Sequence, residues 1–402
     1  MMNSIFFQSL SQWWGAFSFD KLIMLVMAFF VLIGGADHIL GNKYGYGAAF
    51  EQGLSAAGSL MRSVAAIYAC APLLSRLLTP IITPLFTKIG ADPAAFAGII
   101  LSSDMGGYAL SMNMSASPAL GNFCGLILAG TVGSLWVFTI PVAFSIIDEG
   151  DRSIFTCGIL CGLIAIPFGC LAGGLLMAGT DYALPVRTIL INMVPLLVLA
   201  VIVCLGLWFK AGLTTRVFVS FGKAVSYLAT VLTAIAAFEQ ITGILLPAFD
   251  VMMEEDAAGM TGLDEGLLIC AKIALVLAGA FPMVLCIRRH CSGLLAMIGR
   301  ALSINSAASL GFFTSCVNAI PMFSSMKDMD ERGKLFNAAF AAGGAFALGD
   351  YLGYASEAEP QMVLPMLGAK IISGVAGVVL AYLLAPFLLG RGKGDVQKGR
   401  PR

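Results

Sequence analysis

Two short motifs place a carboxylate and an aromatic ring close together inside apolar sequence. Asp104 and Tyr108 lie in the run GIILSSDMGGYALSMNMS, and Asp350 and Tyr354 lie in AAFALGDYLGYA, each in the pattern Asp-x-x-Gly-Tyr. On a helix, residues four apart share one side, so each motif presents an acid next to a ring. An acid neutralises a small cation, and a ring face adds about 0.5–2 kcal/mol of cation–π attraction. The motifs therefore predict a site for a small cation, made by Asp104, Tyr108, Asp350 and Tyr354.

The position of Asp104 in an apolar run favours a functional role for it. A carboxylate near the middle of a membrane costs roughly 2.5 kcal/mol or more, so such acids usually face a cavity, a partner or a solute path. The glycine pair Gly106-Gly107 weakens the helix there, which is tolerated at membrane depth where backbone lines a cavity or is buried in protein. A helix cap, or a pair with an arginine such as Arg62, stays open as the alternative for Asp104.

The composition is that of an integral membrane protein. Of the 402 residues 59% are hydrophobic and 11% charged, whereas soluble domains carry about 25% charged residues. Apolar segments recur from end to end, so we expect an all-α polytopic membrane protein, a single transporter domain over residues 1–402. It should have about ten to twelve membrane segments, including half-helices and re-entrant pieces. The run at residues 73–90, broken by Pro80 and Pro84, is expected to be a half-helix or an interfacial hairpin.

Charged loops predict the orientation. The loop around Lys210, Arg216 and Lys223 is basic, as is the tail at residues 390–402, while the loop at residues 249–266 is acidic. The positive-inside rule then puts the tail in the cytoplasm, for a multi-pass protein of the cytoplasmic (inner) membrane of a cell. Lys+Arg and Asp+Glu both number 23, so no net charge suggests nucleic acid as a partner. The expected partners are the lipid bilayer and a small-molecule substrate.

Nothing in the sequence indicates an enzyme. It contains two histidines, His38 and His290, far apart, and ten cysteines without a Cys-x-x-Cys pair. The usual nucleophile, zinc and phosphate-loop motifs are missing. We expect no catalytic residue, no cofactor and no metal. The spacings Gly158-x-x-x-Gly162 and Gly169-x-x-x-Gly173 predict tight helix packing, and they also allow a homo-oligomer.

An ungapped match at a shift of 180 residues predicts two structural repeats. The matched residues are Ile140, Pro141, Ser145, Asp148, Arg152, Gly169 and Gly173 with Ile320, Pro321, Ser325, Asp328, Arg332, Gly349 and Gly353. Repeat-related halves would cover roughly residues 54–210 and 224–389, with the solute site at their junction. An inverted repeat is the expected arrangement, although the mixed loop from Lys327 to Lys334 gives no direction for the second half. The two Asp-x-x-Gly-Tyr motifs are not in this register.

Other polar residues accompany the motifs. Asn318, before a proline in an expected helix break, and Asn305 are candidates to bind a solute hydroxyl or to orient an acid, with helix capping as the alternative for both. Arg152 lies four residues after Asp148, and Arg332 lies four after Asp328. That spacing predicts a local ion pair in each case.

Long runs of the chain resemble one protein family. They are IGADPAAFAGIILSSDMGGYAL, VFTIPVAFSIID, GLIAIPFGCLAGGL, VNAIPMFSSMKDMDERGK and AAFALGDYLGYA. They are similar to the ethanolamine permease of the bacterial ethanolamine-utilisation system, EutH, and the likeness spans nearly the whole chain. The longer start through Phe19, the run LSINSAAS and the acidic loop depart from the family pattern. The resemblance implies an inner-membrane protein that passes ethanolamine into cells that degrade it, without an ATPase.

The expected function is thus ethanolamine transport by facilitated diffusion or secondary transport, feeding ethanolamine catabolism. The resemblance carries no binding residues, so the substrate-binding set stays our own inference: Asp104, Tyr108, Asp350, Tyr354, Asn318 and Asn305. A proton- or sodium-coupled carrier of another small amine or polar solute is the alternative. A membrane scaffold subunit is a further alternative, but it would leave two acidic motifs without a task.

Overall fold

The structure is a computed structural model, and it describes residues 19–100, 107–133, 135–247, 249–255, 259–290 and 292–398, with residues 7, 8, 11 and 13 near the N-terminus. Within these residues seven helices are long and apolar enough to cross a membrane. They are Lys21–Ile39, Ile67–Lys88, Glu149–Gly179, Val186–Lys210, Gly212–Thr242, Gly262–His290 and Pro360–Leu389. Two shorter apolar helices, Pro118–Gly133 and Ser306–Val317, accompany them. The prediction of an all-α polytopic membrane protein is confirmed.

Large apolar side chains lie exposed along the outer helices. On the first part of α11, Val201, Ile202 and Phe209 are 58%, 60% and 75% exposed. A soluble protein would bury such a continuous apolar stripe, whereas in a membrane protein the lipid tails can cover it. These faces therefore fit contact with lipid.

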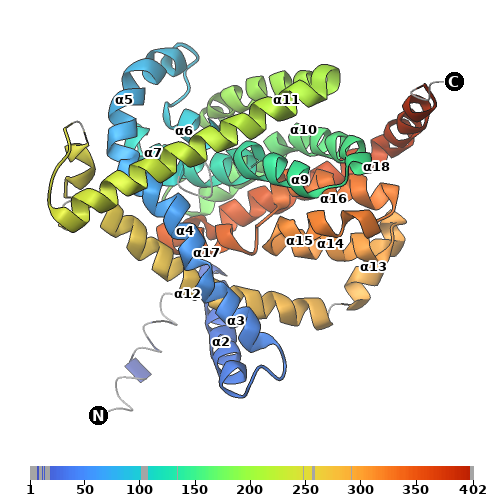
Figure 1. Ribbon diagram of the computed structural model, residues 1–402, viewed down its shortest axis with the longest axis horizontal. Helices are drawn as coiled ribbons and strands as arrows, with labels where there is room; N and C mark the ends of the chain where they lie inside the picture. Colours follow the sequence, from blue (N-terminus) through green and yellow to red (C-terminus); the bar gives the residue numbers. More distant parts are fainter. Residues whose placement is uncertain are drawn as a thin grey trace.

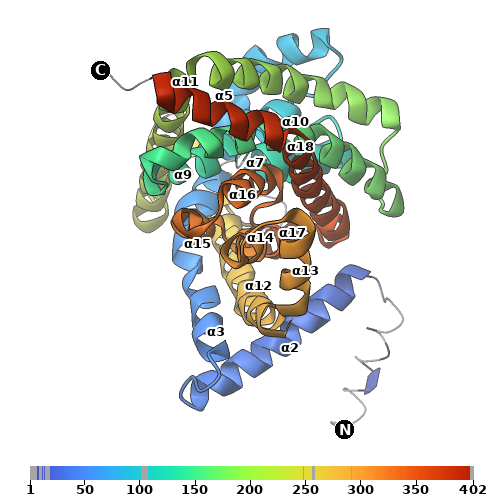
Figure 2. The ribbon, with the colours of Figure 1, turned by 90° about the vertical axis from the view of Figure 1, so that its right-hand side faces the viewer.

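Two helix bundles form the ends of the molecule (Figures 1 and 2). In the first, α12 (Gly262–His290) packs against α2 (Phe19–Ile39) and α3 (Tyr46–Ser55). In the second, α10 (Arg152–Leu176), α16 (Glu331–Gly344) and α18 (Val363–Lys398) pack on one another. The other main elements are α5 (Ala66–Lys88), α6 (Ala94–Ile100), α7 (Gly107–Met114), α8 (Pro118–Asn122), the π-helical segment η2 (Phe123–Gly133), α14 (Ser306–Val317) and α17 (Asp350–Ala358).

Shorter elements join these helices. They are α4 (Ala57–Leu60), η1 (Met61–Ala65), η3 (Leu135–Thr139), α9 (Ile140–Ile146), η4 (Glu149–Asp151), η5 (Met177–Gly179), η6 (Asp250–Met253), α13 (Ser292–Leu302), α15 (Ala319–Ser324), η7 (Met326–Asp328) and η8 (Pro360–Met362).

Residues 180 apart meet where α10 packs against α16. A Cβ added at Gly158 would lie 2.5 Å from that of Ala338, and one at Gly162 would lie 2.3 Å from that of Ala342. Glycine thus permits the close helix approach expected from its spacing. The contacts advance together along both helices, so α10 and α16 run in the same direction. Equivalent helices of an inverted repeat would run in opposite directions, so this pair does not support an inverted repeat, and the division into two halves stays a prediction.

The glycines of α10 all pack against other parts of the same chain. Gly169 and Gly173 face α18, where an added Cβ would lie 1.9 Å from Ser373 Oγ and 2.7 Å from Ala369 Cβ, respectively. Because these faces are covered by the chain's own helices, they give no support to self-association. A homo-oligomer stays a prediction.

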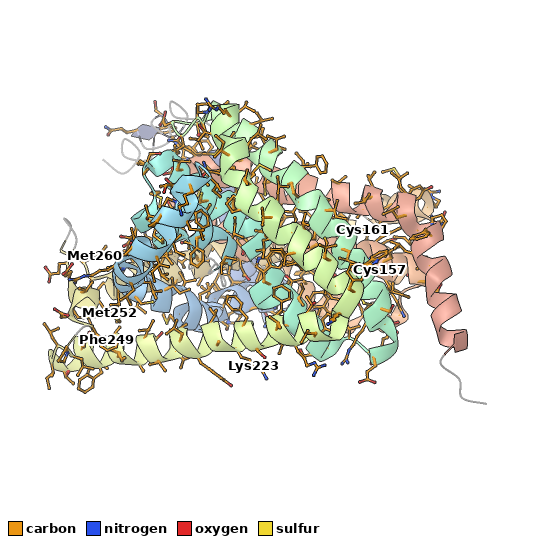
Figure 3. The ribbon with its side chains drawn as sticks, turned by 90° about the horizontal axis from the view of Figure 1, so that it is seen from above. Cys157, Cys161, Lys223, Phe249, Met252 and Met260 are labelled. Atoms are coloured by element: carbon orange, nitrogen blue, oxygen red, sulfur yellow. The ribbon has the colours of Figure 1, made fainter. Side chains whose placement is uncertain are left out.

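Helix α11 (Val186–Thr242) consists of two spans joined at a kink. Lys210 has non-helical backbone angles of φ −142° and ψ 54°. The two parts diverge from there, with Lys223 on the second part and Phe249 and Met252 beyond its far end (Figure 3). A basic residue thus marks the turn between two apolar spans.

The proline-containing run after residue 73 differs from the expectation. It forms the C-terminal part of α5, which continues from Ala66 to Lys88 through Pro72, Pro80 and Pro84. The expected half-helix or hairpin is therefore wrong. Proline removes one backbone donor but does not end a membrane helix whose neighbours compensate for it, and α5 packs against α7, α11 and α12.

Candidate functional site

Helices α16 and α17 are separated by a break at residues 345–349. The N–H groups of Phe346 and Leu348 donate to the carbonyl oxygens of Ser315 and Cys316, at 2.8 and 2.7 Å. These oxygens belong to the last turn of α14, where carbonyls lack a partner in their own helix. The break and the end of α14 therefore satisfy each other's backbone groups, as membrane depth requires.

Gly349 closes this break against α14. A Cβ added there would lie 2.1 Å from the carbonyl oxygen of Val317. The next residue, Asp350, is the first of α17 and is half-buried. The positive end of the α17 dipole favours a carboxylate at this place. The structure thus puts the predicted acid at a helix break inside the protein.

The two Asp-x-x-Gly-Tyr motifs meet through their tyrosines. The rings of Tyr108 on α7 and Tyr354 on α17 pack edge to face, with centroids 5.8 Å apart. The hydroxyl of Tyr354 shares a hydrogen bond of 2.9 Å with that of Tyr68 on α5. We call these three residues the tyrosine cluster; all are buried, and Tyr354 is completely so. Residues far apart in sequence, on three helices, therefore form one aromatic site.

Tyr108 is held from its other side by α8 and η2. Its hydroxyl donates to Asn122 Oδ1 at 3.1 Å. A Cβ added at Gly125 would lie 2.9 Å from the Tyr108 ring. These contacts fix the ring of the first motif against the second motif.

A buried lysine contacts Tyr351, the residue that follows the predicted acid Asp350. Lys370 on α18 is 1% exposed, and its Nζ lies 4.1 Å from the ring centroid of Tyr351. The ammonium also donates to the carbonyl oxygen of Gly130 in η2. A ring face and a carbonyl oxygen are groups that bind a primary ammonium, so this part of the protein already holds one.

The remaining predicted residues lie in different places. Asp104 lies outside the described residues. Asn318 caps α15 by accepting from the N–H of Ile320 at 2.9 Å, next to the carbonyl that packs on Gly349. Asn305 caps α14 and donates to the carbonyl oxygen of Asp328 at 2.8 Å. It lies near the start of α16, whose 14 residues separate it from the break by about 20 Å.

Polar contacts join the elements at both ends of the second bundle. At the end where α10 begins, Lys334 donates to Asp151 at 2.6 Å, with both side chains about 15% exposed. At the other end, Tyr182 donates to Glu359 at 2.6 Å, and Asp181 and Gln361 exchange two hydrogen bonds. The bond to Glu359, together with burial, raises the pKa of Tyr182 to about 12. We name these the Asp151 end and the Tyr182 end.

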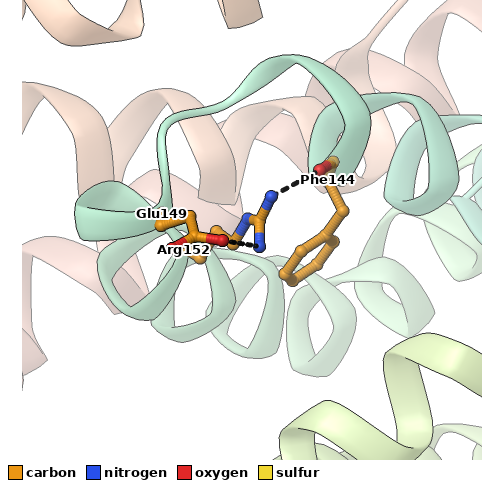
Figure 4. Close-up of polar contacts among 3 residues, drawn as sticks. All are labelled: Phe144, Glu149 and Arg152. Carbon is orange, nitrogen blue, oxygen red and sulfur yellow. Dashed lines mark hydrogen bonds and ion pairs between the residues drawn. The ribbon is translucent and has the colours of Figure 1, made fainter.

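The expected ion pairs four residues apart are wrong. Arg152 pairs with Glu149 at 3.4 Å and donates to the carbonyl oxygen of Phe144 at 3.2 Å (Figure 4). Arg332 lies over the rings of Phe336 and Tyr382, at 5.7 and 5.4 Å. The helical spacing does not hold here, because α10 and α16 begin only at Arg152 and Glu331, after the acids Asp148 and Asp328.

A hollow of about 390 Å³ lies elsewhere, between α9 and the second part of α11. Its lining is mostly apolar, and Lys223 borders it: Pro141, Val142, Phe144, Ser145, Val219, Gly222 and Lys223. It shares no residue with the tyrosine cluster or the break, so it is not part of this site.

The comparisons agree with the resemblance seen in the sequence. The family model described as "Ethanolamine utilisation protein, EutH" matches residues 19–384. The chain belongs to the EutH family. The probable ethanolamine permease EutH of Listeria monocytogenes is 40% identical over 380 residues, 94% of this chain and 98% of the relative. That of Salmonella typhimurium is 36% identical over 390 residues, covering 91% and 96%, respectively. These relatives are named as permeases and not as enzymes. No solved structure matches the chain.

A third relative carries no functional name. The uncharacterized protein YxeR of Bacillus subtilis is 40% identical over 367 residues, 91% of this chain and 95% of the relative. Sequence identity of the same size thus extends to family members without an assigned solute.

Sequence reasoning missed several residues that lie in the candidate site. Tyr68 and Asn122 carry no motif, and only the fold brings them to the cluster. Lys370 was visible as a lysine within the apolar run MLGAKIISGVAG. An ionisable residue in such a run is itself a functional signal.

Proposed function

We propose that the protein carries ethanolamine across the cytoplasmic membrane, by facilitated diffusion or secondary transport, and so feeds ethanolamine catabolism. The names of two relatives support the solute. The observation that carries the proposal is the contact between Tyr108 and Tyr354 beside the break that ends at Asp350. Broken helices near the bilayer midplane are where secondary transporters bind their solutes.

The chemistry of this region suits ethanolamine. Its primary amine, like that of lysine, is largely protonated near neutral pH. Asp350 supplies a negative charge, and the C-terminal carbonyls of α16 turn toward the same break. We assign the ammonium to Asp350 and Asp104, with the rings of Tyr108 and Tyr354 beside it. Asn318 is the candidate for the hydroxyl, because it caps α15 close to the break, whereas Asn305 lies too far away to share the same solute.

The proposed orientation puts the Asp151 end in the cytoplasm. Helix α18 starts beside Asp181, through Gln361, and runs antiparallel to α10 toward the Asp151 end. The basic kink at Lys210 and the basic tail would then lie on the same side, as the positive-inside rule favours. The C-terminus is thus assigned to the cytoplasm and the Tyr182 end to the outside.

Uptake into vesicles tests this function. Radiolabelled ethanolamine should enter proteoliposomes saturably and faster than it enters protein-free vesicles. Asp350→Asn and Asp104→Asn should each lower the initial rate at least about tenfold, because a charge pair at about 4 Å inside a protein is worth several kcal/mol.

Glu357→Gln is the matched control. Glu357 lies on the same helix, α17, but pairs with the half-exposed Lys272 at 3.4 Å. Its variant should transport at close to the wild-type rate. Full uptake by assembled Asp350→Asn and Asp104→Asn would remove the assigned site, and absence of wild-type uptake would remove the function.

A further inference from the structure

Lys370 places a positive charge in the interior of a membrane span. It lies ten residues into the span Pro360–Leu389, about 15 Å along the helix axis. Its side chain is buried between Tyr351 and the carbonyl oxygen of Gly130. Ionisable residues at such depth are costly and usually belong to a solute or proton path.

The groups around Lys370 do not neutralise it. The uncharged thiols of Cys170 on α10 and Cys316 on α14 lie near it, and the ring of Tyr351 on α17 lies under it. The hydroxyl of Thr131 on η2 is hydrogen-bonded to the thiol of Cys170. Within the described part of the chain, no carboxylate lies within 4.0 Å of the ammonium. This lysine therefore has polar neighbours but no permanent counter-charge among them.

The ammonium of Lys370 lies close to the place assigned to the solute. Tyr351, which it contacts, directly follows Asp350, and Tyr354 lies one helical turn further along α17. Positive charges held beside Asp350 and over Tyr351, neighbouring residues of one helix inside the protein, repel each other, and interacting groups of this kind share their protons. Lysine can give up its proton when a second cation arrives, whereas arginine cannot.

We propose that Lys370 is a proton-exchanging residue of the carrier, which releases its proton when an ammonium solute binds at Asp350 and regains one after the solute leaves. This inference rests on the proposed function. In the first step an N–H bond of Lys370 breaks, the electron pair stays on nitrogen, and the proton passes to water on the side from which the solute enters. In the second step the neutral amine takes a proton from water on the other side, once the solute is released there.

The exchange makes net transport electrically neutral. One ammonium ion moves in one direction and one proton in the other, so the sum is the transfer of one uncharged amine. Transport should then respond to a pH gradient and ignore the membrane potential. A carrier with a fixed charge at this position, or with none, would not exchange a proton, so its transport would not follow the pH gradient in this way.

Uptake under two imposed gradients tests the inference. In proteoliposomes of the wild type, an acidic interior should drive accumulation of ethanolamine, about tenfold for each pH unit at one proton per solute. An inside-negative potassium diffusion potential should leave the initial rate unchanged. Uptake by protein-free vesicles is subtracted, since neutral amines also cross lipid.

Two variants of Lys370 separate its charge from its protonation. Lys370→Met removes both, so uptake should lose its dependence on the pH gradient and become several-fold faster with an inside-negative potential. Lys370→Arg keeps a charge that cannot be lost, so every mode of uptake should fall at least about tenfold. Lys272→Met, which removes a half-exposed lysine of α12, should behave as the wild type.

A measurement on the purified wild type does not depend on how the variants fold. Ethanolamine added at about pH 7 to weakly buffered protein in detergent should release about one proton per bound solute, as followed with a pH indicator. Uptake without proton release, or uptake by Lys370→Met that still follows the pH gradient, would overturn this inference and leave the transport function standing. No wild-type uptake at all would overturn both.

Discussion

Helix α10 and the pair α16–α17 occupy corresponding positions in the 180-residue match, yet one is continuous and the other is broken. Residues 152–176 form one continuous helix. Residues 332–356, at the same shift, form a helix, a break and a second helix. The first halves of the two segments lie side by side, with Gly158 on Ala338 and Gly162 on Ala342. The difference is therefore confined to their second halves.

The residues at the break explain the difference. Cys170 and Leu171 in α10 correspond to Asp350 and Tyr351 in α17. Cys170 is buried and bonded to Thr131, whereas Asp350 begins a new helix. A continuous helix satisfies its own backbone and needs no polar side chains. The broken segment depends on the end of α14 for backbone hydrogen bonds and places an acid inside the protein, as in the discontinuous helices that line transporter sites.

The largest effect is expected from Gly349→Ala, which attacks the break itself. The new Cβ would lie 2.1 Å from the carbonyl oxygen of Val317, and backbone on both sides cannot move away easily. The free energy of unfolding should fall by about 3 kcal/mol or more, the upper range for overpacking. Thermal unfolding in detergent, followed by the loss of the monodisperse peak in size-exclusion chromatography, measures this.

Gly179→Ala is the control for that substitution. It lies just after α10, and an added Cβ there would meet nothing within 4 Å. Its unfolding temperature should stay close to that of the wild type. Equal stability of the two variants would mean that the break does not depend on its contact with α14.

A smaller loss is expected from Tyr354→Phe, at the residue that stands where α10 has Gly174. The change removes one partner of the hydrogen bond between Tyr68 and Tyr354 and leaves a buried hydroxyl unsatisfied. That costs about 1–3 kcal/mol. Tyr68→Phe should cost a similar amount, and the double variant no more than either single one. Additive losses in this cycle would contradict a direct bond between the two hydroxyls.

Much of the fold could be predicted from the sequence, because long apolar segments identify membrane helices. The apolar content predicted a polytopic helical protein, and the glycine spacings predicted the close packing of α10. The course of α5 could not be predicted, since three prolines in one run suggest an interruption. Only the neighbouring helices, which stabilise the weakened backbone, decide that it continues.

The site could be predicted in part. The two acidic motifs led to Tyr108 and Tyr354, whose contact is visible only in three dimensions, because no register relates them. Asn305 and Asn318 are both helix caps in the structure, and the type of residue alone does not separate a cap from a ligand. Arg332 was assigned an acidic partner by spacing and contacts two rings instead, because a 3-10 turn precedes its helix.

The smallest effect is expected at the Tyr182 end, where a hydrogen bond joins the segment after α10 to the segment after α17. Tyr182 follows α10 and Glu359 follows α17, and the bond between them is 2.6 Å long. Tyr182→Phe should lower the free energy of unfolding by only about 0.5–1.5 kcal/mol, since the bond is partly exposed and Asp181 and Gln361 still hold the two segments together. Thermal unfolding of the wild type and of Tyr182→Phe in detergent near pH 7 measures this difference in stability.

The stability difference between the wild type and Tyr182→Phe should also shrink at alkaline pH, because the pKa of Tyr182 is raised in the folded protein. Because that pKa is raised from 10.0 to about 12 in the folded protein, the stabilisation is complete below about pH 10 and is lost as the pH rises through about 10 to 12. The wild type and Tyr182→Phe should therefore converge near pH 11, while Tyr227→Phe, at a residue 68% exposed on α11, follows the wild type throughout. A difference that grows with pH would mean that the phenolate, and not the phenol, of Tyr182 bonds to Glu359, which a carboxylate partner does not allow.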